Sequence, residues 1–343
     1  MTATNTPHLR PISEISPKST VLLRMDLDVP MENEKVVDAD RLIKSIPTIQ
    51  ELLEKQCKII ILGHMGRPKG IDPKYSLKPV FTELLTLLKT DVPATFVEDV
   101  ENESIIEAAI NDNTLVCLEN LRFYKGEETN NPQFLVSLVK KASWFVNDAF
   151  AVAHRRHSSI MLFQSMQTAY GIAFIDEVTK IMKVIHDPGR PLTIVLGGAK
   201  EDKLSYLEGL EKIADHILLG GKLPTYLKDK ELLLQHAKYC IASLTANTFD
   251  INADDIAAFT AILSVSKTIV WAGAMGMFEN PEYQKGTVAI AKAVVASGAY
   301  TILAGGDTES SVSNLGEEKK INLIASGGGV MLELLTKGTL PAW

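Results

Sequence analysis

The chain alternates short apolar runs with longer amphipathic segments. Residues 21–30 begin with an apolar run, and 58–64 form a second one that is rich in β-branched residues. Segments 41–56 and 76–90 carry apolar residues at helical spacing, and Ser76 is the expected N-cap of the latter. Continuous apolar strands separated by helices are typical of parallel sheets covered on both faces. The pattern therefore predicts an α/β fold with doubly wound parallel sheets.

A single helical stretch, 173–188, follows one series of strands and precedes another that begins at Thr193. With 343 residues, the chain exceeds one typical core, so two domains are expected. We predict a first domain at 1–172, an inter-domain helix at 173–188 and a second domain at 189–332. The tail, 333–343, is expected to pack back on the first domain. The alternative is that 173–188 is simply one more packed helix.

In the first half, the predicted strands end next to arginine or histidine. His64 and Arg67 follow one strand, Arg122 follows the next, and a basic run at 154–157 follows a third. Ligands of open α/β sheets bind beyond the carboxyl ends of the strands. Arginine there makes charge-assisted, often bidentate bonds to carboxylate or phosphate. The first domain is therefore predicted to hold an anionic ligand with its side chains.

In the second half, the strands end in glycine instead. The five segments are 193–200, 216–222, 268–276, 301–308 and 323–329. Glycine lets backbone N–H groups approach a phosphate, and a following helix N-terminus favours its negative charge. The second domain is therefore predicted to hold a second anionic ligand, mainly with its backbone.

Composition narrows the class of partner. The formal net charge is −7, so non-specific nucleic-acid binding is not expected. No run of 18 or more apolar residues predicts a membrane span, and the N-terminal segment lacks the apolar core of a signal peptide. The odd cysteine count (Cys57, Cys117 and Cys240), without metal-like spacing, favours a reducing cytoplasm. We expect a cytoplasmic protein with small-molecule ligands.

Ten motifs occur in the order found in phosphoglycerate kinases, and the chain resembles that family over nearly its whole length. They are LLRMDLDVP, DADRLIKSIPTI, LGHMGRPKG, KYSLKPV, LENLRFYKGEE, VNDAFAVAHRRHSS, LGGAKEDK, WAGAMGMFE, AGGDT and SGGGVMLELL. The resemblance implies two Rossmann-like domains joined by a hinge helix. It also implies reversible phosphoryl transfer in glycolysis, between 1,3-bisphosphoglycerate with ADP and 3-phosphoglycerate with ATP. Magnesium with the nucleotide, and a monomer, are expected.

The resemblance also assigns the predicted site residues. Substrate-binding residues would be Asp26, Asp28, Arg41, His64, Arg67, Arg122 and Arg155. Arg41 and Lys200 would act on the moving phosphoryl group, and Asp307 would bind the magnesium ion. Nucleotide-binding residues would be Gly198, Lys200, Lys203, Gly220, Gly221, Gly276, Glu279, Gly305, Gly306, Asp307, Thr308, Gly327, Gly328 and Gly329. Five basic residues at strand or loop ends outweigh the alternative that they only form surface ion pairs.

Several positions depart from the family pattern. Asp28 replaces an asparagine, which puts an acceptor-only carboxylate beside an anion site unless Arg156 compensates. The GGAKEDK motif is one residue short, so Lys203 is expected either to keep its role or to point elsewhere. Lys222 replaces a glycine under the base, and Ala272 and Ala274 replace asparagine and proline. The stretch between 227 and 249 is also shorter than usual. We therefore expect weak discrimination among nucleotide bases.

Three hypotheses follow for the function. The first is an active, short phosphoglycerate kinase. The second is a catalytically impaired binding protein that keeps the substrate site, although Lys200, Lys203 and Asp307 would then have no reason to persist together. The third is a kinase for a related small phosphorylated carboxylate, which Asp28 favours and the complete arginine set opposes.

Overall fold

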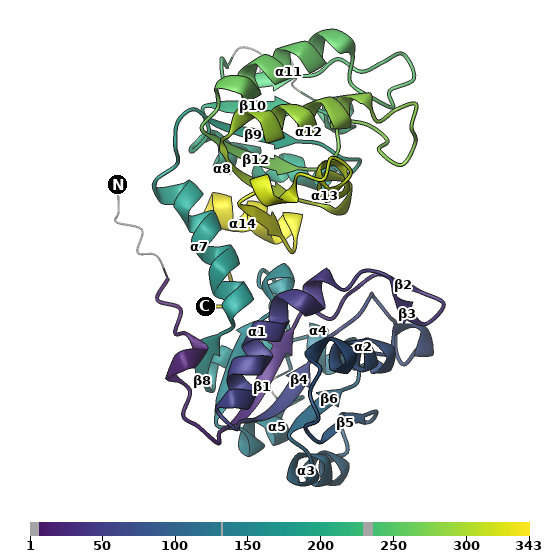
Figure 1. The fold of residues 1–343 in the computed structure, drawn as a ribbon, viewed down its shortest axis with the longest axis vertical. Helices are drawn as coiled ribbons and strands as arrows, with labels where there is room; N and C mark the ends of the chain where they lie inside the picture. Colours follow the sequence, from purple (N-terminus) through teal and green to yellow (C-terminus); the bar gives the residue numbers. More distant parts are fainter. Residues whose placement is uncertain (1–6, 132, 229–235) are drawn as a thin grey trace. The chain divides into compact units, whose positions relative to one another are not determined.

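The computed structural model describes residues 7–131, 133–228 and 236–343 (Figure 1). It contains two six-stranded sheets in which every strand pair is parallel, and helices cover both sheets. The predicted fold class is therefore confirmed. A short antiparallel hairpin, β2 (Met31–Glu32) with β3 (Lys35–Val36), follows the first strand.

The first sheet has the order β5-β6-β4-β1-β7-β8. Its strands, in that order, are Ala94–Val97, Leu115–Leu118, Lys58–Leu62, Thr20–Met25, Trp144–Asp148 and Gln167–Tyr170. Side chains of β1 alternate between two apolar cores, so that Leu23 faces one and Leu22 the other. Burial on both faces explains why these strands read as continuous apolar runs.

Helices supply the other half of each core. The helices of this part of the chain are α1 (Asp40–Glu54), α2 (Lys78–Leu88), α3 (Glu103–Asp112), α4 (Lys125–Glu128), α5 (Val136–Lys141) and α6 (Ser158–Met161). Helices α1 and α2 pack on one face of the sheet, and α3 and α5 on the other. The predicted N-cap at Ser76 is wrong by one residue, because α2 begins after Leu77. The Ser76 hydroxyl still accepts a hydrogen bond from the N–H of Lys78 (3.2 Å).

The second sheet has the order β11-β10-β9-β12-β13-β14. Its strands are Tyr239–Ile241, His216–Leu219, Leu192–Leu196, Thr268–Ala272, Tyr300–Ala304 and Leu323–Ala325. The helices are α8 (Leu207–Glu211), α9 (Leu223–Tyr226), α11 (Ala253–Val265), α12 (Lys285–Ser297), α13 (Gly306–Ser313) and α14 (Gly328–Lys337). Helices α11 and α12 lie side by side, and with α13 they bury one apolar core against the sheet (Figure 1).

Two compact units divide the described chain. One comprises 7–176 with Leu340–Trp343, and the other comprises Glu177–Thr339. Helix α7 (Ile172–His186) begins in the first unit and ends in the second. The hinge role of the segment 173–188, and the domain boundaries, stay predictions. Among the described residues, no helix combines the length and the apolar character needed to cross a membrane.

Candidate active site

The carboxyl ends of β1 and β4 carry three of the predicted substrate residues. Asp26 and Asp28 follow β1, and His64 follows β4. In addition, Arg122 lies on the 3₁₀ turn Leu121–Phe123 after β6, and Arg155 lies in the segment after β7. Parallel strands bring these positions to one edge of the first sheet, as the strand pattern predicted.

The remaining predicted substrate residues lie at the periphery of this edge. Arg41, in the first turn of α1, donates a hydrogen bond from Nη1 to the main-chain oxygen of Asp28 (2.8 Å). Arg67 is exposed in the loop after β4. Arg156, which the sequence suggested as a partner for Asp28, is also exposed.

Arg24 is a buried cation that sequence reasoning missed. Its side chain is fully buried in β1, and Nη2 lies 2.7 Å from Nδ1 of His64. Its Nε donates to Oγ of Ser159 (2.9 Å), whose hydroxyl donates in turn to the buried carboxylate of Glu127 (2.6 Å). A single arginine within an apolar strand was the available signal, because a buried charge requires a partner.

This network sets the proton positions on His64. Arginine can only donate, so Nδ1 of His64 accepts and the ring carries its proton on Nε2. Burial, together with Arg24 and Arg122, lowers the pKa of His64 well below its usual value. Burial and the same arginines lower the pKa of His157 to about 4. Both imidazoles are therefore neutral at pH 7, and the positive charge of the cluster comes from arginine.

Repulsion among cations also acts on Arg122. Its pKa is lowered to about 10, first by burial and then by the charges of Arg155 and Arg24. Its Nη1 donates to the carbonyl oxygen of Gly66 (2.6 Å), and Nε lies 3.5 Å from the Glu128 carboxylate. Cations held together in this way favour binding of an anion, because the anion relieves their repulsion.

Asp26 has one carboxylate oxygen ready for a ligand donor. Its Oδ2 accepts a hydrogen bond from the N–H of Ala151 (3.0 Å). Its Oδ1 is buried and has no hydrogen-bond partner among the described residues. Burial raises the pKa of this carboxyl, and the charges of Arg41 and Arg24 oppose the shift. A hydroxyl from a bound ligand would satisfy Oδ1.

Asp28 is tied to its own unit rather than to Arg156. Its Oδ1 accepts a hydrogen bond from the N–H of Gly66 (2.9 Å), and Oδ2 lies 4.0 Å from Nε2 of His64. In the part of the chain that the structure describes, Arg156 is not among its partners. The carboxylate thus holds the loop after β4. It also brings a negative charge to the edge of the group formed by Arg24, Arg122 and Arg155, which we call the arginine cluster.

The second unit has a cavity of about 260 Å³ that contains part of the predicted nucleotide set. Predicted residues on its wall are Gly198, Gly221, Gly276, Glu279 and Asp307. Thr248, Phe249 and Met277 also line it, and sequence reasoning did not assign them. Their signal was weak, because the nearby stretch is short and unlike the family; residues 229–235 of that stretch lie outside the described residues.

Lys203 points back over the central strands of the second sheet. It lies on the 3₁₀ helix Glu201–Tyr206, and Nζ donates to the carbonyl oxygens of Gly197 (2.7 Å) and Ala272 (3.0 Å). Burial lowers its pKa to about 8, and the Asp202 and Asp307 carboxylates oppose this shift. Lys200, the N-cap of this helix, is exposed. The shortened motif therefore leaves Lys203 at the carboxyl ends of β9 and β12.

Several glycine amides are already engaged. The N–H groups of Gly198, Gly220 and Gly221 donate to the carbonyl oxygens of Ala274, Leu196 and Met275 at 2.7, 2.9 and 3.1 Å. At Gly221, φ is +57° and a Cβ would come within 2.5 Å of the nitrogen of Gly198. Glycine is required here so that neighbouring loops can approach closely, and these amides are not available to a phosphate.

The helix N-termini offer the available amides. Helix α13 begins at Gly306 after Gly305, and α14 begins at Gly328 after Gly327, with Gly329 following. A Cβ at Gly306 or Gly329 would meet no atom within 4 Å, so both positions are open. Thr308 is buried, and its Oγ1 accepts a hydrogen bond from the N–H of Gly273 (3.0 Å). Asp307 is exposed in the first turn of α13 and lines the cavity.

Comparison with known proteins identifies the family. The family model described as phosphoglycerate kinase matches residues 14–239 and 234–338. A phosphoglycerate kinase of Thermus thermophilus is 34% identical over 383 aligned residues, covering 97% of this chain and 98% of that protein. The enzyme named "Phosphoglycerate kinase, cytosolic" from Triticum aestivum is also 34% identical, over 94% of this chain and 93% of its own length.

Solved structures agree with the sequence comparison. Phosphoglycerate kinase from Pyrococcus horikoshii has a TM-score of 0.83 and 26% identity, with 97% of both chains covered. The enzyme from Coxiella burnetii has a TM-score of 0.78 at the same identity and coverage. The chain therefore belongs to the phosphoglycerate kinase family, whose members are phosphotransferases with a carboxyl group as acceptor.

Proposed function

We propose that the basic edge of the first unit binds 3-phosphoglycerate and that the glycine edge of the second binds magnesium with ATP or ADP. The reaction is reversible transfer of the γ-phosphoryl group of ATP to the carboxylate of 3-phosphoglycerate. The observation that carries this proposal is the buried cluster of Arg24, Arg122 and two neutral histidines beside the open carboxylate oxygen of Asp26. Such a cluster suits a ligand with two anionic groups and a hydroxyl.

In the acceptor site, each residue has a distinct task. Arg122 and Arg155, with Arg67 at the periphery, neutralise the phosphate and carboxylate of the ligand. Oδ1 of Asp26 accepts the hydrogen bond of the substrate hydroxyl, and neutral His64 donates from Nε2. Arg41 is offered as the cation that reaches the transferring group, as the family resemblance implies.

In the donor site, helix N-termini and lysines hold the phosphates. Gly306 begins α13, and Gly328 and Gly329 form the first turn of α14. The N–H groups of a helix's first turn have no partner within the helix, and its positive end favours phosphate. Two lysines supply cations. One is Lys203, whose pKa burial lowers to about 8, and the other is the exposed Lys200. The hard oxygens of Asp307 suit magnesium, which is commonly bound by one or two carboxylates together with substrate phosphates. Bound magnesium would neutralise charge on the phosphates.

The chemical step requires positioning rather than a covalent enzyme intermediate. A carboxylate oxygen of 3-phosphoglycerate attacks the γ-phosphorus, and the bond from that phosphorus to the β–γ bridging oxygen breaks. The products are the acyl phosphate and ADP. Charge spreads over the transferring group as it moves, and Arg41 and Lys200 are the residues proposed to stabilise it.

The test is formation of ADP from MgATP that depends on 3-phosphoglycerate. We expect turnover with 3-phosphoglycerate and little with 2-phosphoglycerate or phosphoenolpyruvate. A matched pair of adjacent arginines provides the control, because Arg155 is half-buried in the cluster and Arg156 is exposed. Arg155→Ala should raise KM for 3-phosphoglycerate about tenfold or more, and Arg156→Ala should change it less than about threefold.

Two other outcomes distinguish the competing hypotheses. Tight binding of 3-phosphoglycerate without turnover would support an impaired binding protein. Turnover with another phosphorylated carboxylate, but not with 3-phosphoglycerate, would support a kinase of altered specificity; the carboxylate of Asp28 at the edge of the cluster favours this second candidate. We also propose a monomer, and a cytoplasmic location, which the name of the Triticum aestivum relative supports.

A further inference from the structure

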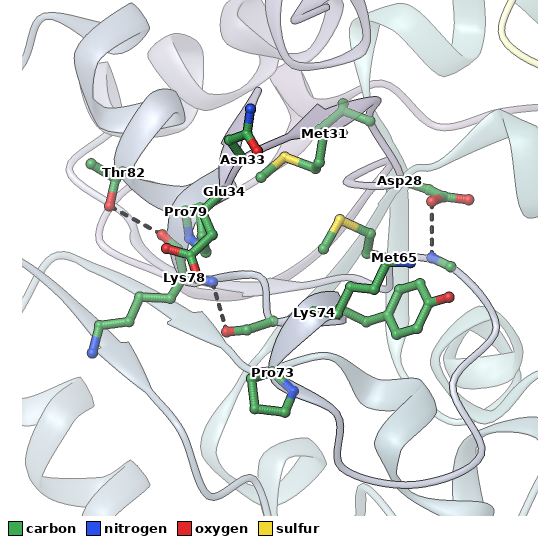
Figure 2. Close-up of a pocket in the computed structure, with 14 residues that line it drawn as sticks. Asp28, Met31, Asn33, Glu34, Met65, Pro73, Lys74, Lys78, Pro79 and Thr82 are labelled. Carbon is green, nitrogen blue, oxygen red and sulfur yellow. Dashed lines mark hydrogen bonds between the residues drawn. The ribbon is translucent and has the colours of Figure 1, made fainter. Parts of the chain in front are cut away.

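The first unit contains a hollow that the phosphoryl-transfer reaction does not account for. It is a cavity of about 810 Å³, within the range of about 300–1,000 Å³ typical of small-molecule sites. Its wall comes from the β2–β3 hairpin, the loop after β4, the 3₁₀ turn Pro73–Tyr75 and the first turns of α2 (Figure 2). Of the described lining residues, Gly66 accepts a hydrogen bond from Arg122, and Asp28 lies beside His64.

The interior of this hollow is apolar and adaptable. The side chains of Met31 and Met65 point into it in Figure 2. Val29, Tyr75 and Pro79 complete the apolar wall. Methionine side chains are flexible and polarisable, so they adjust to flat or irregular apolar ligands. Polar side chains also line the hollow, among them Asn33, Ser76 and Thr82. The side formed by the two methionines therefore suits an aromatic or aliphatic body.

The rim of the hollow carries one cation with no carboxylate partner in the described chain. The ammonium of Lys74 lies 5.7 Å from the centre of the Tyr75 ring, and Lys74 forms no ion pair with the described residues. Lys78 differs, because its Nζ is bonded to the Glu98 carboxylate (2.9 Å) and points away from the hollow (Figure 2). The carboxylates of Glu34 and Asp28 also line the hollow and would repel a second negative charge. A ligand would therefore carry one anionic group, placed at Lys74.

We propose that this hollow is a binding site for a small amphiphilic monoanion, with an apolar body against Met31 and Met65 and a carboxylate or sulfonate at Lys74. The shared wall links the site to the arginine cluster. The N–H of Gly66 donates to Asp28, and its carbonyl oxygen accepts from Arg122 (2.6 Å). A Cβ at Gly66 would come within 2.3 Å of the Tyr75 ring, so the loop is closely fitted to the hollow.

The first experiment measures binding of 8-anilinonaphthalene-1-sulfonate by fluorescence on the full chain, with saturating MgATP present to occupy the other cavity. Lys74→Glu should weaken binding about tenfold or more, because it replaces the attracting charge by a repelling one. Met31→Asp should weaken binding similarly, because it puts a negative charge at a half-buried position of the apolar wall. Lys140→Glu, an exposed lysine on α5, is the matched control and should change binding less than about twofold.

The outcomes of this experiment are decisive. Unchanged binding in both hollow variants, with a circular dichroism spectrum like that of the parent, would overturn the proposal. The proposal would also be overturned if the probe fluoresced without MgATP but not with it, since the probe would then occupy the second unit.

A second experiment tests the link, and it alone rests on the proposed 3-phosphoglycerate site. Two anions on either side of the Gly66 loop should oppose each other, so saturating 3-phosphoglycerate should weaken probe binding about threefold, reciprocally. Equal affinity with and without 3-phosphoglycerate, when isothermal titration shows that 3-phosphoglycerate is bound, would remove the link. A titration that shows no binding of 3-phosphoglycerate would count against the proposed function and leave the hollow untouched.

Discussion

Arg41 and Lys200 are the residues proposed to act on the moving phosphoryl group. Arg41→Ala and Lys200→Ala should each lower kcat about 10²–10³-fold with little change in substrate affinity, by analogy with loss of one oxyanion donor. Steady-state kinetics with separate binding titrations would measure both effects. Lys212→Ala is the control, since Lys212 is exposed and pairs only with Glu208, four residues earlier, among the described residues. Near-parental turnover of either variant would mean that its assigned role is wrong.

Asp28 offers a test of a single charge. Asp28→Asn keeps an oxygen that can accept from the N–H of Gly66 and removes the negative charge near His64. Binding of 3-phosphoglycerate should therefore tighten, because an anion would approach a less negative edge. Asp28→Ala is the paired variant, since it removes the charge and also releases Gly66. Weaker binding in the asparagine variant, measured by titration calorimetry, would show that the Asp28–His64 contact helps to build the pocket.

Helices and strands could be predicted from the sequence more readily than the contacts of buried polar groups. Residues 58–64 and 193–200 were predicted as strands because a short apolar run between loops is typical of a buried strand. Strands β4 and β9 confirm both predictions. The hydrogen bonds that join Arg24, Ser159 and Glu127 were not predicted, because these residues are far apart in the sequence. Periodicity reports how a segment is buried, whereas a polar network depends on which buried segments meet.

Asp148 joins three elements and makes stability depend on pH. It ends β7, and its Oδ1 accepts from the N–H of Phe174 on α7 (3.1 Å). Burial raises its pKa from 3.8 to about 7, opposed by hydrogen bonds from Phe174, Ser45 and Thr48, the last two on α1. The folded chain therefore binds this proton more tightly than the unfolded chain does. Its contribution to stability is full below about pH 4 and is lost as the pH rises through 7.

Asp148→Asn should remove this dependence. The free energy of unfolding of the parent, relative to the variant, should fall by on the order of 2–4 kcal/mol between pH 4 and pH 7.5. Urea unfolding at a series of pH values measures it. His157, with its pKa lowered to about 4, acts in the opposite sense, but it is present in both chains and cancels in the difference. Asp112→Asn, an exposed carboxylate on α3, is the control; equal slopes for parent and Asp148→Asn would contradict the assignment.

The loops around the cavity of the second unit bear on how well the protein would distinguish ATP from GTP. The parts proposed to face the phosphates are Lys203, Asp307 and the starts of α13 and α14, and they would contact groups that ATP and GTP share. Lys222 replaces the expected glycine and lines the cavity with Phe249 and Met277. A site with few buried polar partners for a base rejects analogues poorly. We expect kcat/KM for MgATP and MgGTP, measured side by side, to agree within about tenfold; a thousandfold preference for ATP would refute this.

At the scale of the whole molecule, the two ligand sites belong to different compact units. The proposed acceptor residues lie within 7–176, and the proposed donor residues lie within Glu177–Thr339. Phosphoryl transfer requires the two ligands to meet and water to leave. Each unit can build its own half of the reaction, so binding of one ligand alone does not require the same arrangement as binding of both.

The radius of gyration in solution should therefore be smaller with both 3-phosphoglycerate and MgADP bound than with either ligand alone. This pair cannot react, so the complex persists during small-angle X-ray scattering. The physical reason is that a shared, water-excluding site forms only when the second ligand adds its contacts to the first. Arg155→Ala is the control, measured at ligand concentrations that leave its 3-phosphoglycerate site empty. It should keep the larger radius, and this distinguishes closure from an effect of the nucleotide alone. An unchanged radius in the parent, with both sites shown by titration to be occupied, would mean that transfer proceeds without closure.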